Sequence, residues 1–562
     1  MNKFFTWWKS GAPYIWLNAG AVSISLVVVV GLILMIAAKG MGHFWLSDIV
    51  ALDYRTSALE DSTKLVGEIT GTELVDAEQY LDSLSPEIKA KAMEKIGDAR
   101  TVERWLLKTG NREILGRDFR WLDSFWVTNM QKPKDLLMIE RVEWGNLYGT
   151  LQSVQQAGAQ VSSQASRWEE FQTRLQRVDD LRDDIRELEK GEMSAISFKL
   201  EKLRLKGKRL ALENKNTPEA LKQLDQQEQA LYAEYAVYRK ELADLYQQAA
   251  RDSVVIEVMD GQRVTLSMDK IVAAYLPNQM SVLEKLYHYI LRFIDFIVAD
   301  PREANTEGGI FPALFGTVLM VLLMSVIVTP FGVISAIYLR EYASQGVMTR
   351  LVRIAVNNLA GVPSIVYGVF GLGFFVYFLG GSLDALFYPE AAPAPVFGTP
   401  GILWASLTLA LLTVPVVIVS TEEGLSRVPR SLREGSLALG ATKAETLWKV
   451  VLPMVGPSIM TGLILAVARA AGEVAPLMLV GVVKLAPELP MDGNFPFMHL
   501  DRKFMHLGFH IYDVGFQSPN VEAARPLVYA TSFLLVLVII ILNLSAIVLR
   551  NRLREKFKGM EH

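Results

Sequence analysis

Residues 456–483 read GPSIMTGLILAVARAAGEVAPLMLVGVV, and this stretch decides how the chain must be placed. It is longer than the roughly 20 apolar residues that a helix needs to cross a bilayer. It nevertheless carries two charges, Arg469 and Glu473, near its centre. Ionisable groups near the bilayer midplane are costly unless they are paired or hydrated. We expect a helix on which these side chains, four residues apart, share one face and neutralise each other.

Five further stretches are long and uncharged enough to cross a membrane. They are residues 14–38, 309–339, 354–382, 401–421 and 526–549. The sequence therefore predicts a mainly α-helical protein with six transmembrane helices. The first stretch is too long for a signal peptide and lacks a clear small-residue cleavage site, so we expect it to be retained.

The distribution of Lys and Arg predicts the orientation, because short cytoplasmic loops carry an excess of both. With the N-terminus inside, the inside segments hold fifteen Lys and Arg, whereas the short outside loops hold four. The inside segments are residues 1–13, 340–353, 422–449 and 550–562, and the outside loops are 383–400 and 484–525. Both termini are predicted to be cytoplasmic, with residues 39–308 extracytoplasmic.

These spans divide the chain into four parts. We expect an N-terminal tail with the first transmembrane helix (1–38), an extracytoplasmic segment (39–308), a membrane domain with five helices (309–549) and a basic cytoplasmic tail (550–562).

Residues 165–250 are predicted to form an antiparallel helical hairpin with a coiled-coil seam. Apolar residues recur in steps of three and four along the first arm, and in steps of three, four and seven along the second. They are Phe171, Leu175, Val178, Leu181, Ile185 and Leu188, and then Leu221, Leu224, Leu231, Tyr235, Tyr238, Leu242 and Leu245. Thr217 and Pro218 form a typical helix start, so a turn precedes them. The alternative, one long helix, would place this proline in a helix interior at a cost of about 3 kcal/mol.

The rest of the extracytoplasmic segment predicts a small α+β module from which the hairpin projects. Residues 253–268 contain two strand-like runs around Asp260-Gly261, which is a strong β-turn signal. Residues 116–127 and 136–151 are rich in aromatic and β-branched side chains, as strands are.

Residues 280–299 predict an amphipathic helix just before the second span. Its apolar face would hold Leu283, Leu286, Ile290, Phe293, Ile294 and Ile297. Such a helix fits an interfacial position along the lipid headgroups. Burial against the extracytoplasmic module explains the same pattern equally well.

Composition excludes several classes of function. The formal net charge of -3 leaves no excess of cations for nucleic acid. The absence of Cys excludes disulfides, thiolate catalysis and cysteine-ligated metals. Only His506 and His510 are spaced to share a helix face, and no carboxylates accompany them, so we expect no metal site. No catalytic constellation is present, and we expect no cofactor on this chain.

The predicted cytoplasmic loop before the fifth span carries a spaced motif. Glu434 is followed by Gly440 and, after nine residues, by Val450, Leu452 and Pro453. This spacing resembles the EAA loop of bacterial ABC importer permeases, with Gly435 and Ser436 where that pattern often has two alanines. In that family the loop docks on the ATPase, so the resemblance implies the same role for the five residues.

Other stretches are similar to phosphate permeases of the PstA type. They are residues 336–342, 360–368 and 468–477. The resemblance covers residues 309–558 well and the first span loosely, and residues 39–308 are an insertion relative to the shorter members. It implies a six-helix ABC importer permease with an α+β extracytoplasmic insertion, located in the bacterial inner membrane.

The resemblance also implies an activity and its partners. These are import of inorganic phosphate, a second permease of the PstC type, a dimer of a separate ATPase and an extracytoplasmic phosphate-binding protein. ATP would be used by the partner, because the chain lacks a Gly-x4-Gly-Lys-Ser/Thr loop.

Two questions stay open. Arg469 can meet an anion in the permeation path, with Glu473 orienting it, or the two residues can form a structural ion pair. Sulfate and molybdate permeases could also use an intramembrane Arg. A second hypothesis for the whole chain is a membrane sensor or assembly protein with an outward coiled coil, which would require a cytoplasmic output module.

Overall fold

The computed structural model describes residues 7–8, 10–55, 62–97, 99–161, 166–259, 261–518 and 521–558. Within them, six helical segments are long and apolar enough to cross a membrane. They are Pro13–Gly42, Phe311–Tyr342, Ser364–Phe387, Ile402–Arg427, Lys443–Ala471 and Ala524–Arg552. The prediction of a mainly helical chain with six spans is confirmed. Residues 559–562 of the predicted basic tail lie outside the described residues.

The membrane region consists of the first span and the helices after residue 309. Its elements are α2 (Ala12–Gly42), α10 (Phe311–Ile337), η5 (Tyr338–Tyr342), α11 (Val347–Leu359), α12 (Ser364–Phe370), η6 (Gly371–Gly380), α13 (Gly381–Phe387), η7 (Pro389–Ala391), α14 (Ile402–Arg427), α15 (Arg430–Ala438), α16 (Lys443–Thr446), η8 (Leu447–Val451), α17 (Leu452–Ala471), α18 (Leu477–Val480), α19 (Leu507–Tyr512), η9 (Asp513–Gln517) and α20 (Val521–Lys558).

Small residues let α10, α14 and α17 approach closely. A Cβ on Gly332 of α10 would lie 2.6 Å from the side chain of Val417, and one on Gly462 of α17 would lie 2.7 Å from Ser420. Without a hydrophobic force between helices in lipid, such close packing supplies much of their association. A buried apolar core therefore runs between the three helices.

The third span differs from its predicted bounds of 354–382. Helix α11 ends at Leu359, and α12 begins at Ser364 after a turn with Pro363 at its N-cap. The residue before a proline is disfavoured in a helix, and proline suits a helix start. The uncharged stretch thus contains the end of one helix and most of another.

Two antiparallel sheets form the polar segment that precedes α10. The first has the strand order β4-β3-β2-β1-β5, and the second has the order β10-β9-β7-β6-β11, with β8 paired to β7. The strands are β1 (Ile49–Tyr54), β2 (Thr63–Asp76), β3 (Thr101–Lys108), β4 (Phe119–Asp123), β5 (Val127–Gln131), β6 (Leu136–Arg141), β7 (Asn146–Gln156), β8 (Ala159–Gln160), β9 (Asp252–Glu257), β10 (Arg263–Ser267) and β11 (Ile271–Tyr275).

The remaining short elements of this segment complete the α+β fold. They are α3 (Ala77–Asp82), α4 (Pro86–Ile96), α5 (Arg112–Leu115), η1 (Ser124–Trp126), η3 (Met268–Lys270), α9 (Val282–Val298), β12 (Pro301–Arg302), η4 (Glu303–Asn305) and β13 (Glu307–Gly308). Strands β9 and β10 form a hairpin whose Val258 N–H donates to Gln262, and Asp260 of its predicted turn lies outside the described residues.

The helical hairpin consists of α6 (Arg167–Glu187), η2 (Leu188–Met193), α7 (Ser194–Leu212) and α8 (Pro218–Ala249). Its turn lies where Thr217 and Pro218 predict it, and the Thr217 hydroxyl accepts a hydrogen bond from the Ala220 N–H at 3.3 Å. The coiled-coil interpretation of the first arm is wrong at its base. Phe171 and Val178 are fully buried against the second sheet, beside Leu137 and Ile256.

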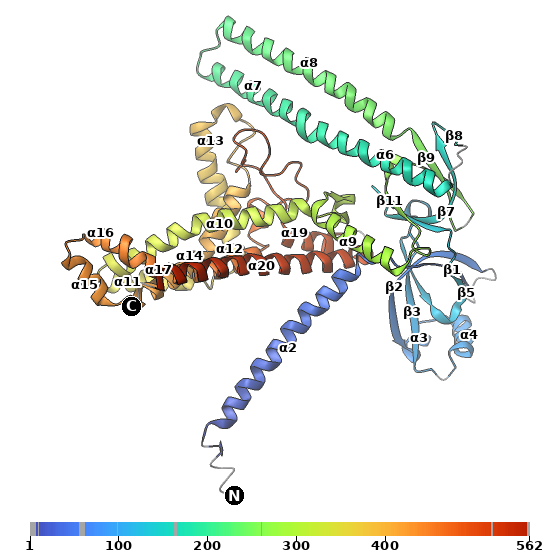
Figure 1. The fold of residues 1–562 in the computed structure, drawn as a ribbon, viewed down its shortest axis with the longest axis horizontal. Coiled ribbons are helices and arrows are strands. Elements are labelled where there is room, and N and C mark those ends of the chain that lie inside the picture. Colours follow the sequence, from blue (N-terminus) through green and yellow to red (C-terminus); the bar gives the residue numbers. More distant parts are fainter. Residues whose placement is uncertain are drawn as a thin grey trace.

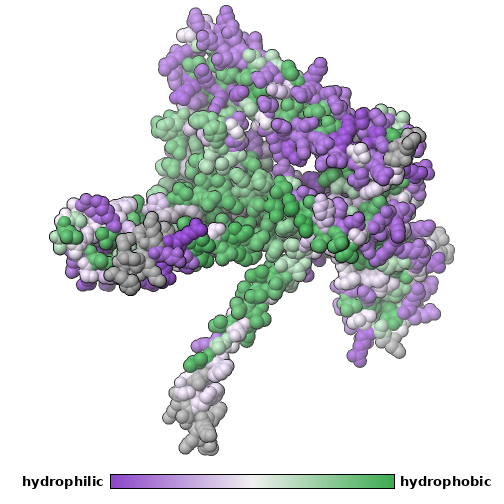
Figure 2. Space-filling model, in the orientation of Figure 1, coloured by the Kyte–Doolittle hydropathy of each residue, from purple (hydrophilic) through white to green (hydrophobic). Residues whose placement is uncertain are grey.

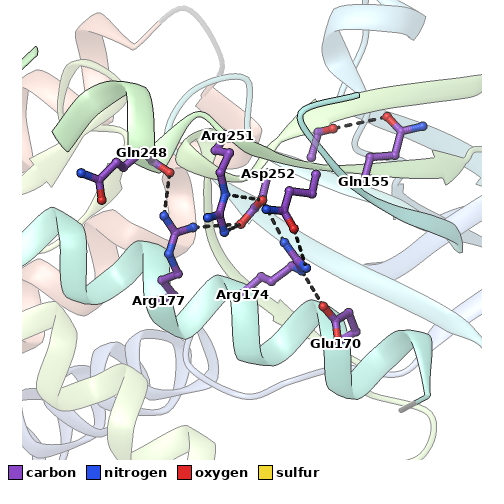
Figure 3. A network of polar contacts seen from close by, with 9 residues as sticks. Gln155, Glu170, Arg174, Arg177, Gln248, Arg251 and Asp252 are labelled. Carbon is purple, nitrogen blue, oxygen red and sulfur yellow. Dashed lines mark hydrogen bonds and ion pairs between the residues drawn. The ribbon is translucent and has the colours of Figure 1, made fainter. Parts of the chain in front are cut away.

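One buried carboxylate ties the hairpin to this sheet (Figure 3). Asp252, at the start of β9, is fully buried and pairs with Arg174 and Arg177 of α6 and with Arg251. Each of the three N–O distances is 2.9 Å. Burial alone would raise the pKa of Asp252, but the three guanidiniums outweigh it and hold the pKa below its usual value. Both arms are thereby fixed at their base.

The hairpin lies over the membrane region rather than projecting freely (Figure 1). From α7, Lys202 Nζ donates to the carbonyl of Phe495 at 3.1 Å, and Lys208 Nζ donates to that of Ala392 at 3.1 Å. The Phe495 carbonyl belongs to the loop that follows α18, and the Ala392 carbonyl belongs to the loop that precedes α14. The first arm therefore bridges two predicted outer loops.

The Asp252 cluster makes a testable prediction. Asp252→Asn should destabilise the base of the hairpin by about 2 to 4 kcal/mol, because it removes the buried counter-charge of Arg177 and Arg251, while Arg174 keeps its pair with Glu170. Both of these guanidiniums are partly exposed, which limits the loss. Since the pKa of Asp252 is lowered in the folded chain, this stability is present above about pH 4 and is lost as the pH falls further.

Hydrogen exchange of α6 and the end of α8 measures the effect. Glu228→Gln, on the exposed side of α8, is the matched control and should leave exchange unchanged. Equal exchange in the two variants would contradict the assigned role of Asp252.

Candidate functional site

The two charged residues of the fifth span lie where its helix stops. Helix α17 ends at Ala471, and Glu473 follows in a non-helical turn before α18. The expectation that both residues lie on one face of a continuous helix is therefore wrong. The ion pair nevertheless exists, with 3.7 Å between Arg469 Nε and Glu473 Oε1. Gly472 ends the helix, and Pro476 lacks the N–H that a continuing helix would use.

The packing of α17 on α14 gives the depth of this pair. A Cβ on Gly462 would contact Ser420, and one on Gly424 would contact Ser458. Extending this antiparallel register at equal rise places Arg469 beside residues 410–413 of α14. This level is about midway along the uncharged part of α14, which runs from Ile402 to Thr421, just before Glu422.

A second interrupted helix packs against the first interruption. A Cβ on Gly368 of α12 would lie 2.7 Å from Cα of Pro476, so this glycine lets α12 approach the backbone of the turn. Tyr367 is 4% exposed, and its hydroxyl donates to the Leu359 carbonyl at 2.6 Å. That bond satisfies a carbonyl at the end of α11. The two helix breaks are thus adjacent within the membrane region.

The ion pair is accessible rather than sealed. The side chains of Arg469 and Glu473 are 33% and 20% exposed in the isolated chain. Non-helical backbone at membrane depth is tolerated where it is buried in protein or lines a water-filled cavity. An accessible cation beside unwound backbone can offer charge-assisted hydrogen bonds to an anion, and Glu473 can take its place when no anion is bound.

The predicted coupling loop forms two short helices joined at Gly440. Glu434 is exposed on α15, and Gly440 has a φ of 88° in the left-handed region that glycine tolerates best. Val450, Leu452 and Pro453 are half-buried where the loop joins α17. The five motif residues therefore mark the start, the turn and the end of one connector.

Sequence reasoning missed the apolar surface of this connector. Leu437, Leu439 and Trp448 are exposed, with Leu439 reaching 91%. Their signal was available, because three large apolar residues in a short polar loop are unusual in a solvent-exposed segment. It also missed the bond that fixes the loop, an ion pair of 3.0 Å between Arg433 and Glu341.

The two spaced histidines are buried structural residues. His506 Nδ1 accepts a hydrogen bond from the Gly508 N–H at 3.1 Å, at the start of α19. Burial lowers the pKa of both His506 and His510 to about 4, so both are neutral at physiological pH. Over the described residues, no group of three or more His, Asp or Glu is arranged to hold a metal ion.

Comparison with known proteins places the membrane region in a family. Residues 328–559 match the family described as binding-protein-dependent transport system inner membrane component. The probable phosphate transport system permease protein PstA of Methanocaldococcus jannaschii is 30% identical over 224 residues, covering 39% of this chain and 72% of that protein. The chain belongs to the PstA family of ABC transporter permeases. It is therefore a multi-pass protein of the inner membrane.

Other relatives match a smaller share of their own length. Phosphate transport system permease protein PstA 1 of Mycobacterium tuberculosis is 39% identical over 175 residues, which are 31% of this permease and 52% of that protein. The probable ABC transporter permease protein YqgH of Bacillus subtilis is 30% identical over 221 residues, 39% of this permease and 65% of that protein. The permease thus spans between half and two thirds of the length of these two relatives.

The contact between the two helix breaks makes a prediction. Gly368→Ala should destabilise the permease by about 1 to 3 kcal/mol, because the new methyl group meets the Pro476 backbone and one of the two segments must move. Gly373→Ala is the matched control, since a Cβ there has nothing within 4 Å. Thermal unfolding of the purified permease in detergent tests this, and equal melting temperatures would show that the contact is unimportant.

Proposed function

We propose that this chain is the membrane-spanning permease subunit of an ABC importer that carries inorganic phosphate across the cytoplasmic membrane. The relatives named for phosphate transport support the substrate, and the match extends over the helix that carries Arg469. The observation that carries the proposal is an accessible Arg–Glu pair at the meeting point of two interrupted helices.

In this proposal, Arg469 and Glu473 belong to the transport path. A guanidinium can bind phosphate through two parallel hydrogen bonds. When no anion is bound, the single contact of Arg469 with Glu473 leaves part of this donor capacity unused. The 3.7 Å separation from Glu473 is longer than a strong charge-assisted hydrogen bond, so exchange of the carboxylate for an anion costs little. A purely structural pair would gain more from a shorter, fully buried contact.

The proposed partners follow from the same family membership. A second permease of the PstC type would complete the path, a separate ATPase dimer would bind the coupling loop and use ATP, and an extracytoplasmic binding protein would deliver phosphate. The orientation with both termini cytoplasmic and residues 39–308 outside is part of this proposal. It is supported by the Lys and Arg distribution.

The coupling loop is proposed to dock on the ATPase through its exposed apolar residues. Leu439 and Trp448 are both exposed on this loop, and Leu439 adjoins the turn at Gly440. Arg433 connects this loop to the end of the second span through Glu341. A push on the loop would therefore reach α10 as well as α17. The sensor hypothesis offers no comparable use for these residues.

Replacement of the central cation tests the transport path. Arg469→Gln should lower phosphate uptake by about 10- to 100-fold, because a hydrogen bond to a charged group contributes about 1.5–3 kcal/mol. Arg469→Lys should retain part of the activity, since it keeps the charge but loses bidentate binding. Uptake of radioactive phosphate by cells is the measurement, normalised to permease in the membrane.

The control is Arg427→Gln, which breaks an exposed pair with Glu423 at the predicted cytoplasmic end of α14. It should leave uptake unchanged. Full uptake by Arg469→Gln at normal membrane levels would remove this residue from the path. Loss of the protein itself in both Arg469→Gln and Glu473→Gln would favour the structural ion pair instead.

Docking of the ATPase is tested on the loop. Gly440→Val should weaken co-purification of the ATPase, because a β-branched residue is strained at a φ of 88°. Leu439→Asp should do the same by placing a charge in an apolar contact, and a bulky residue at Glu434 should interfere with docking of α15. Arg550→Gln, at the predicted cytoplasmic end of α20, serves as the control. Unchanged recovery of the ATPase with the loop variants would place the docking surface elsewhere.

A further inference from the structure

Helix α9 exposes a broad apolar stripe on the side that faces away from the protein. Seven of its apolar residues are exposed, namely Leu283, Leu286, Tyr287, Ile290, Leu291, Ile294 and Val298, whereas Phe293, Phe296 and Ile297 pack against a core of the protein. Leu283 is the most exposed of them at 78%. An amphipathic helix of a soluble domain normally turns such a stripe toward the core. Water is therefore an unsuitable environment for this side of α9.

The opposite face of α9 directs its cations into the protein. Lys285 is 7% exposed and pairs with Asp48. Arg292 pairs with Glu140 of β6 at 2.7 Å. These bonds fix the rotation of the helix about its axis, because turning the apolar stripe inward would break both pairs. The exposed stripe is thus imposed by the structure.

The position of α9 indicates what covers the stripe. In Figure 1 it runs crosswise to α2, at the end of α2 that meets α20. Phe44, just beyond α2, packs edge-on against Phe293 of α9 with 5.3 Å between the ring centroids. Because α2 is a membrane span, a helix lying across its predicted outer end lies at the membrane surface. Figure 2 shows the apolar surface continuing from the membrane helices to this region.

We propose that α9 lies in the outer leaflet of the membrane, with its apolar stripe among the lipid acyl chains and its cationic side bound to the sheet module. The chemistry of the stripe favours lipid over a protein partner. It is mostly aliphatic, whereas the centres of protein interfaces are enriched in aromatic residues, Met and Arg. Tyr287, within the stripe, and Trp45, next to α2, are residues typical of the lipid headgroup boundary.

The charged residues at the border of the stripe are consistent with this depth. Glu284 and Asp295 are exposed along one side of the helix, next to the apolar arc. In an interfacial helix such groups remain at the headgroup level while the arc is buried by about 5–10 Å. The sheets and the hairpin would then be attached to the membrane beside α10, independently of which anion the permease carries.

The absence of Cys from the chain makes a direct test possible. Leu286→Cys, Ile290→Cys and Ile294→Cys place a spin label on the stripe of the full-length chain, reconstituted in vesicles of phosphatidylcholine and phosphatidylglycerol. Collision of the label with oxygen, which concentrates in lipid, is compared with collision with a water-soluble nickel chelate. Val28→Cys on α2 is the lipid reference, and Glu228→Cys on α8 is the water reference.

The proposal expects all three labels to resemble Val28→Cys, with oxygen collisions exceeding nickel collisions several-fold relative to Glu228→Cys. Labels that resemble Glu228→Cys would place the stripe in water and overturn the proposal. Labels protected from both reagents would show a protein partner on the stripe and also overturn it. Thermal unfolding that matches the unsubstituted chain verifies that the exposed substitutions leave the fold intact.

Discussion

A charged pair within an apolar segment is the constraint on which the membrane region depends. Arg469 and Glu473 can persist there only with partners or with water, and the helix stops between them. Unwound backbone at this depth has the same requirement as the charges. Both requirements are met at one place, where α12 packs against the turn through Gly368. Helices α10, α14 and α17 approach one another closely around this place through small residues.

The sequence predicts the number of membrane helices but not where the important one ends. A hydropathy pattern counts apolar residues and does not register a break within them, so the predicted fifth span continued through the turn. The local signals were present, since Gly472 and Pro476 are typical of a helix end. The pairing of Arg469 with Glu473 was predictable from proximity alone. Its neighbour Gly368, from a different span, was not.

The polar segment shows the same division between local and tertiary information. Thr217 and Pro218 predict the hairpin turn because capping depends on neighbouring residues. Heptad spacing on α6 correctly identifies its buried side, but Phe171 and Val178 are covered by the second sheet rather than by the other arm. Periodicity states which face is apolar and cannot state what covers it. Asp252 likewise gave no sequence signal, because Arg174 and Arg177 of α6 lie 78 and 75 residues away from it in the sequence.

The polar segment is attached to the membrane region at several points and is therefore mechanically coupled to it. Arm α7 holds two predicted outer loops through Lys202 and Lys208, and Asn305 donates a hydrogen bond of 2.7 Å to the carbonyl of Lys484 in one of them.

The base of the same arm, formed by α6, is in turn fixed to the second sheet through the Asp252 cluster. Alternating access in transporters proceeds through rigid-body movement of one part against another. Movement of either loop must therefore break the bonds to α7 or move the hairpin with it. The large polar segment is consequently coupled to the outer loops by its own contacts, whatever else binds to it.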